Sequence, residues 1–94
     1  RLVVSGHIKS WGIIYDESDR KPLGRVVARL FNAKFNKLAA TQITDRKGRY
    51  QFLAGDGDYY VTYEKLGYHP YRQEVDLKGS EAEVVDKDVG LKKQ

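Results

Sequence analysis

The feature that most constrains the fold is a run of turn signals and alternating segments between Ile43 and Tyr68. Asp45 can accept hydrogen bonds from the backbone amides of a turn, and Gly48 can adopt the positive φ angle that such a turn requires. The segments after this turn place apolar and aromatic side chains at alternate positions, and therefore on one face: Tyr50, Phe52, Tyr59, Val61 and Tyr63. The pattern predicts antiparallel strands joined by tight turns.

Short alternating segments between Gly, Asp and Pro residues continue along the chain, which favours strands over helices. We expect seven strands, at residues 12–16, 25–31, 38–44, 49–53, 59–64, 71–77 and 84–91. Pro70 should mark the start of a strand because it cannot donate to a sheet ladder. The stretch 31–40 could instead hold one turn of helix, since Leu38, Ala39 and Ala40 favour helix. The class predicted is all-β, a seven-stranded antiparallel two-sheet Greek-key sandwich.

The 94 residues are enough for one domain with one core, which we assign to residues 12–94. Residues 1–11 form either an extra N-terminal edge strand or the tail of a linker, and the sequence leaves both open. The alternation of the strands predicts a core made of Ile14, Val26, Ala28, Leu30, Tyr50, Phe52, Tyr59, Val61 and Val89.

The net charge of +4 comes from basic residues that are interleaved with acidic ones. Such a pattern is typical of a solvated surface rather than of a stripe that follows phosphates. A nucleic-acid site at Arg46, Lys47 and Arg49 is the weaker alternative. No apolar run approaches the roughly 20 residues of a membrane span, so we expect no membrane insertion.

The motifs of catalysis are missing from the sequence. His7 and His69 are the only histidines, there is no cysteine, and neither a nucleophile elbow nor a zinc spacing occurs. We therefore expect a protein that is not an enzyme and has no cofactor. Two acidic loops remain, and their acids either form turns or bind calcium through carboxylates and carbonyls: Asp16, Glu17 and Asp19, and Asp56 and Asp58.

Aromatic residues suggest an interaction surface. If Ile14 points into the core, then Trp11, Ile13 and Tyr15 point outward as an apolar stripe. Phe31 and Tyr60 also lie opposite the predicted core faces. An exposed apolar stripe usually marks a contact surface. Its partner would be a neighbouring domain, another protein or a glycan stacked on Trp11 and a tyrosine; alternatively, residues 1–10 fold back and cover it.

The motifs follow one another in a recognisable order. They are Gly12, Ile14 and Asp16, then Pro22-Leu23-Gly24, then Thr44, Asp45, Gly48, Tyr50 and Phe52 of one hairpin, then Gly57 and Tyr59, and Gly67-Tyr68. In this order the chain resembles the carboxypeptidase regulatory-like domain, an immunoglobulin-like, transthyretin-like (prealbumin-like) sandwich.

The resemblance implies an accessory module of exported, bacterial cell-surface proteins, located outside the cell, in the periplasm or on the surface. In carboxypeptidases of that kind the catalysis belongs to a separate zinc domain. The function expected is a non-catalytic spacer and protein-interaction domain, whose partners are neighbouring domains or another surface protein. The alternative is a recognition domain that binds carbohydrate or calcium.

Overall fold

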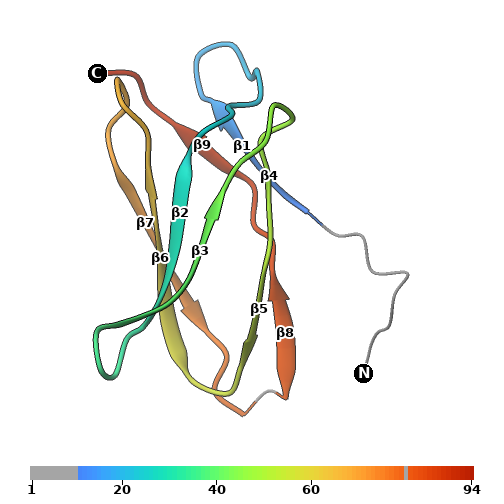
Figure 1. Cartoon of the computed structure of the whole chain (residues 1–94), viewed down its shortest axis with the longest axis vertical. Coiled ribbons are helices and arrows are strands. Elements are labelled where there is room, and N and C mark those ends of the chain that lie inside the picture. The colour runs from blue at the N-terminus through green and yellow to red at the C-terminus, as the bar shows by residue number, and fades with distance from the viewer. Residues whose placement is uncertain (1–10, 80) are drawn as a thin grey trace.

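The computed structural model describes residues 11–79 and 81–94. This part of the chain forms nine strands and confirms the all-β class (Figure 1). The strands are β1 (Gly12–Asp16), β2 (Val27–Asn32), β3 (Lys37–Ile43), β4 (Arg49–Tyr50), β5 (Phe52–Gly55), β6 (Asp58–Glu64), β7 (Tyr71–Asp76), β8 (Ala82–Val85) and β9 (Val89–Leu91).

The strands are arranged as a sandwich around one core. One sheet has the order β3-β2-β6-β7 and is antiparallel throughout. In the other layer β1 lies between β4 and β9, and the chain continues from these strands into the pair β5-β8. The β1–β9 pair is parallel, whereas β1 and β4 are antiparallel. Figure 1 shows β1 between the strands β4 and β9.

Two of the seven predicted strands are divided. The predicted strand 49–53 is interrupted at Gln51, because β4 pairs with β1 while β5 pairs with β8. The predicted strand 84–91 is interrupted at residues 86–88 for the same reason, since β8 pairs with β5 and β9 with β1. β1 lies between β4 and β9, whereas β5 and β8, which belong to the same two segments, pair directly with each other.

The predicted strand 12–16 occurs with the same bounds, the other predicted strands have ends shifted by no more than two residues, and β7 starts directly after Pro70, as expected. The proposed helical turn within 31–40 is wrong. Residues 33–36 form a hairpin turn in which the Asn32 side chain accepts hydrogen bonds from the amides of Lys34 and Phe35. The possible extra N-terminal strand is one of two alternatives for residues 1–11, and all of these except Trp11 lie outside the described part of the chain.

The core contains the predicted residues, because alternate positions of both layers point inward. Ile14, Val26, Ala28, Leu30, Tyr50, Phe52, Val61 and Val89 are all buried. Tyr59 is only partly buried and packs against this cluster. Strands β7, β8 and β9 add Val75, Val85 and Leu91.

Two buried tyrosines carry hydrogen bonds across the core. The Tyr50 hydroxyl donates to the Lys87 carbonyl at 2.6 Å, so the Tyr63 hydroxyl donates to Tyr50 at 2.8 Å. Their rings meet edge to face, with centroids 5.5 Å apart. The two bonds fix the connection between β8 and β9 against β4 and β6.

The hairpin between β3 and β4 has the predicted chemistry. The Asp45 carboxylate accepts hydrogen bonds from the amides of Lys47 and Arg49, and Gly48 has a φ of 73°. The Gly48 carbonyl also accepts a bond from the Ile14 amide at 2.8 Å, so the turn is packed against β1.

This packing predicts that Gly48→Ala destabilises the fold more than Gly67→Ala does. Both glycines have a positive φ, which costs a substituted residue about 1–2 kcal/mol. A Cβ atom at position 48 would lie 2.5 Å from the Ile14 carbonyl oxygen, whereas one at position 67 meets nothing within 4 Å. We expect Gly48→Ala to lower the free energy of unfolding in urea by about 2–4 kcal/mol. Equal losses at the two positions would contradict the packing argument.

The tyrosine pair predicts a loss of stability in alkali. Burial raises the pKa of Tyr50 to about 12 from its ordinary value of 10.0, and it raises the pKa of Tyr63 further. The unfolded chain therefore loses these protons first, so stability is complete below pH 10 and falls as the pH rises toward 12.

Phenylalanine variants measure this effect. Tyr63→Phe should cost about 1 kcal/mol at neutral pH, and Tyr50→Phe about 2–3 kcal/mol because it leaves two partners unpaired. Both variants should lose less stability in alkali than the parent chain when urea midpoints are compared. An unchanged alkaline slope in both would show that other groups cause the loss.

Candidate interaction surfaces

Asp16, at the end of β1, is a buried carboxylate whose two oxygens both have partners. One oxygen accepts hydrogen bonds from the amide and hydroxyl of Ser18, at 2.8 and 2.6 Å. The other accepts a bond from the Tyr68 hydroxyl at 2.7 Å and lies 3.6 Å from the Lys93 ammonium. We call these four residues the Asp16 anchor. It joins the end of β1 to the corner after β6 and to the C-terminal segment.

The electrostatics of the Asp16 anchor follow from these contacts. The hydrogen bonds from Ser18 and Tyr68 hold the pKa of Asp16 well below its usual range. The same carboxylate raises the pKa of Tyr68 to about 12, because it stabilises the protonated hydroxyl that donates to it. The anchor is therefore a structural unit of one carboxylate and its donors at neutral pH.

The other acids proposed for calcium have separate partners. Glu17 lies 3.9 Å from Lys92, and the Asp19 carboxylate accepts a bond from the Lys21 amide. Asp56 accepts a bond from the Gly79 amide, and Asp58 lies 3.7 Å from Lys78. The two acidic loops lie at opposite ends of the sandwich (Figure 1). Within residues 11–79 and 81–94, no three His, Asp or Glu residues form a group that could hold a metal ion.

The stripe predicted on β1 does face outward, and arginines cover its two aromatic members. Ile13 and Tyr15 are half-buried, while Trp11 is 41% exposed. The Arg49 guanidinium lies 5.4 Å from the Trp11 ring centre, and Arg20 lies 5.5 Å from that of Tyr15. The Tyr15 ring also lies against Gly90, where an added Cβ would be only 2.8 Å away. Glycine at position 90 thus makes room for this tyrosine.

Phe31 and Tyr60 do not extend the β1 stripe. They lie opposite each other on β2 and β6, on the outer face of the other sheet. The predicted exposure of Tyr60 is wrong, because only 8% of this residue is accessible. The Phe31 ring stacks on the Tyr60 ring, with the ring centres 4.9 Å apart. The Arg72 guanidinium lies 3.8 Å from the centre of the Tyr60 ring.

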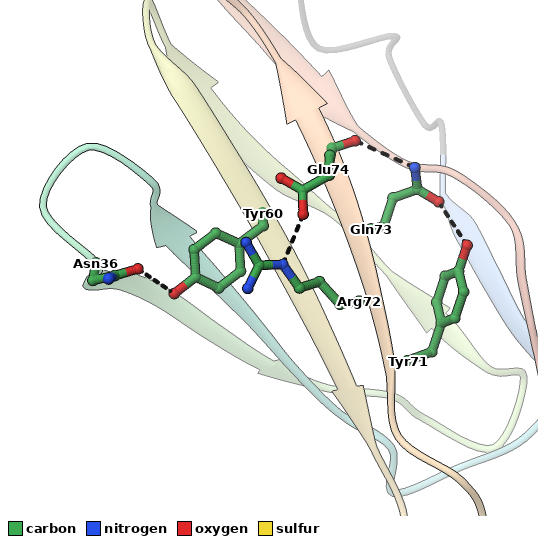
Figure 2. Close-up of polar contacts among 6 residues, drawn as sticks. All are labelled: Asn36, Tyr60, Tyr71, Arg72, Gln73 and Glu74. Atoms are coloured by element: carbon green, nitrogen blue, oxygen red, sulfur yellow. Dashed lines mark hydrogen bonds and ion pairs between the residues drawn. The ribbon is translucent and has the colours of Figure 1, made fainter.

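Figure 2 shows how the polar groups around Tyr60 satisfy one another. The Tyr60 hydroxyl donates to the Asn36 side chain at 2.8 Å, and Arg72 pairs with Glu74 at 2.7 Å. On the same strand, Tyr71 and Gln73 are hydrogen-bonded at 3.3 Å. On the outer face of β7, Arg72 therefore has partners in Tyr60 and Glu74, whereas Tyr71 and Gln73 lie on the other face of the strand.

Sequence reasoning did not find a groove of about 290 Å³ beside β7 and β9. Its lining includes His69, Tyr71, Gln73, Val89 and Lys92. His69 is exposed and borders this groove, and its amide donates to the Lys92 carbonyl. No local signal predicts this groove, because its walls come from strands of the two different layers.

Three comparisons with known proteins found no match. No protein-family model matches the chain, no curated protein matches it, and no solved structure matches it. Within the part of the chain that the structure describes, no helix is long and apolar enough to cross a membrane.

The Asp16 anchor predicts a specific dependence of stability on acid. Because the pKa of Asp16 is lowered, its contribution is complete above the ordinary value of 3.8 and is lost as the pH falls through the lower value. Asp16→Asn should be less stable than the parent chain at neutral pH, and the difference in urea midpoint should narrow below pH 3.8.

Glu17→Gln serves as the control, because Glu17 is exposed and 3.9 Å from its partner. This control should unfold near the parent midpoint at every pH. A constant difference between Asp16→Asn and the parent across the acid range would contradict the electrostatic role of Asp16.

Proposed function

We propose that this chain is a non-catalytic structural module, a spacer that carries tension between polypeptide segments on its two sides. The observation that supports this is the pairing of β1 with β9, the first and last described strands, as parallel neighbours. Ile14 lies opposite Val89, Tyr15 opposite Gly90, and Asp16 opposite Leu91. Two further bonds tie the ladder at its ends: Ile13 amide to the Asp88 carboxylate, and Glu17 amide to the Leu91 carbonyl.

The parallel arrangement decides how the ladder responds to force. The chain enters β1 at one end of the pair and leaves β9 at the other end. Tension applied to the two chain ends therefore acts along the strands and shears the ladder. In shear, the hydrogen bonds share the load and must break together, whereas in peeling they break one at a time. Resistance to forced unfolding depends on the unfolding rate, which a barrier of this kind lowers.

The C-terminal segment adds to this resistance. The Gln94 amide donates to the Gly67 carbonyl, and the Lys93 ammonium lies near the Asp16 carboxylate. The Asp16 anchor therefore joins the end of β1 to the residues that follow β9. Both oxygens of this buried acid are used in structural bonds, which supports a mechanical rather than a catalytic role.

We further propose that the module belongs to the carboxypeptidase regulatory-like domains and has their seven-stranded Greek-key, immunoglobulin-like topology. The hairpin of Thr44, Asp45 and Gly48 supports this, as does Tyr68 at the Gly-Tyr corner. On this proposal the chain is part of an exported or cell-surface protein, and its partners are the neighbouring domains of that protein. Interdomain contact would then use outward-facing residues such as Trp11 and Ile13.

Pulling experiments on single molecules test the mechanical role. The chain has no cysteine, so one introduced at the exposed Lys87 gives a unique attachment point at the β9 start. Pulling the N-terminus against Lys87→Cys peels β1 from β9, whereas pulling the two chain ends shears the same pair. We expect a higher rupture force in shear, and a lower one after Asp88→Ala because Ile13 loses its partner. Equal forces in the two geometries would overturn the proposal.

A further inference from the structure

The edge strand β3 has few of the features that usually protect a sheet edge, namely Lys37 at its start and the register shift opposite Leu30 and Phe31. Every residue from Lys37 to Ile43 is exposed except Ala40, which is half-buried. Lys37 is the only charged residue of β3, and this strand contains neither proline nor glycine. Natural edges are normally blocked by charges, proline or shortness. The opposite edge of the same sheet, β7, carries Arg72, Glu74 and Asp76.

The backbone of β3 offers hydrogen-bonding groups to an incoming strand. The Thr44 amide donates to the Val26 carbonyl of the neighbouring chain segment at 3.0 Å. In an antiparallel pair the bonded residues alternate, so Gln42 and Ala40 bond to β2 through Ala28 and Leu30. The amides and carbonyls of Thr41 and Ile43 therefore point away from the sheet.

Two apolar side chains lie beside these backbone groups. Leu38 is 51% exposed and Ile43 is 63% exposed. The register shifts by one residue between them, so that Leu38 pairs with Phe31 and Ile43 with Val27. Both side chains therefore lie on the outer face of the sheet, although their positions in the sequence differ by an odd number. An added strand could pack apolar side chains against both.

Basic residues lie at both ends of this edge. Ile43 borders an open hollow of about 610 Å³ together with Arg25 and Arg46. Neither arginine makes an ion pair with a described residue, whereas Asp45, the acid of the same hollow, is paired with Arg49 at 2.7 Å. Lys37 begins the strand at its other end. The charge around the edge is therefore positive and available to a partner.

Pairing with a second copy of the chain would give the two arginines of the hollow no acidic partner. In an antiparallel pair centred on Thr41, Lys37 of one copy would lie opposite Asp45 of the other, and this carboxylate is already paired with Arg49. The two arginines would remain without an acid, whereas a segment with an acidic end would pair with them.

We propose that the β3 edge binds an extended segment of another protein, added as a strand, with uncharged residues along β3 and acidic residues at its ends. Main-chain hydrogen bonds to Thr41 and Ile43 supply affinity, as in other cases of strand addition. Carboxylates placed near Arg25 and Arg46 at one end, and near Lys37 at the other, supply selectivity.

The test uses two capped synthetic peptides as long as β3. Both have alternating valine and threonine in the centre; one ends in glutamates and the other in lysines. The isotope-labelled chain is titrated with each and followed by backbone amide shifts. We expect saturable shifts at Leu38, Thr41 and Ile43 and slower amide exchange at Thr41 and Ile43, with the glutamate peptide binding more tightly.

Two variants separate the backbone and charge contributions. Thr41→Pro removes an outward amide without removing a bond to β2, so the fold should persist and peptide binding should be lost. Arg25→Gln combined with Arg46→Gln should weaken the glutamate peptide about fivefold, as expected for two exposed charge pairs. The matched control, Lys87→Gln with Lys92→Gln, removes the same charge away from the edge and should leave binding unchanged.

Three results would overturn the proposal. Equal affinity for the two peptides would remove the charge selectivity, and unchanged binding in Thr41→Pro would show that the peptide does not add to β3. Concentration-dependent shifts at β3 without peptide, accompanied by dimerisation in sedimentation, would make a second copy the occupant instead.

Discussion

The position of β1 is the constraint on which the rest of the structure depends. It pairs with β4 on one side and with β9 on the other, so the second layer is complete only when the last strand has reached the first. The bond between Ile13 and Asp88 joins residues 75 positions apart. Contacts of this separation require much of the chain to be ordered before they form, which is typical of slowly folding β proteins. The same pairing divides both long segments that flank β1.

Polar groups inside the fold define which segments meet. The Asp16 anchor joins three parts of the chain through one carboxylate, and the Tyr50–Tyr63 pair holds the β8–β9 connection through the Lys87 carbonyl. Among the described residues, no buried side-chain nitrogen or oxygen lacks a hydrogen-bond partner. Buried polar groups are costly when unpaired, so these contacts favour one arrangement over alternatives with the same apolar burial.

The outer surfaces differ in how many of their aromatic and charged side chains have partners within the chain. On β7 and β6, Arg72 covers Tyr60 and pairs with Glu74, so both aromatic and charged groups have partners within the chain. Arg49 and Arg20 cover Trp11 and Tyr15 in the same way on the other layer. At β3 the apolar side chains of Leu38 and Ile43 are exposed, and neither Arg25 nor Arg46 makes an ion pair with a described residue. This contrast between the two edges of one sheet is the physical basis for proposing recognition at β3 rather than at β7.

The sequence by itself determined the features that depend on neighbours a few residues away. These include the Asp45–Gly48 turn, the strand after Pro70, and the inward parity of Ile14, Leu30 and Val61. Tertiary structure decided the breaks in the two long segments, the burial of Asp16, the cover over Tyr60 and the exposed edge at β3. Backbone donors and acceptors are chemically alike in every strand, so local sequence cannot state which strands pair. That choice is made by side chains far apart in the chain, which meet only in the folded protein.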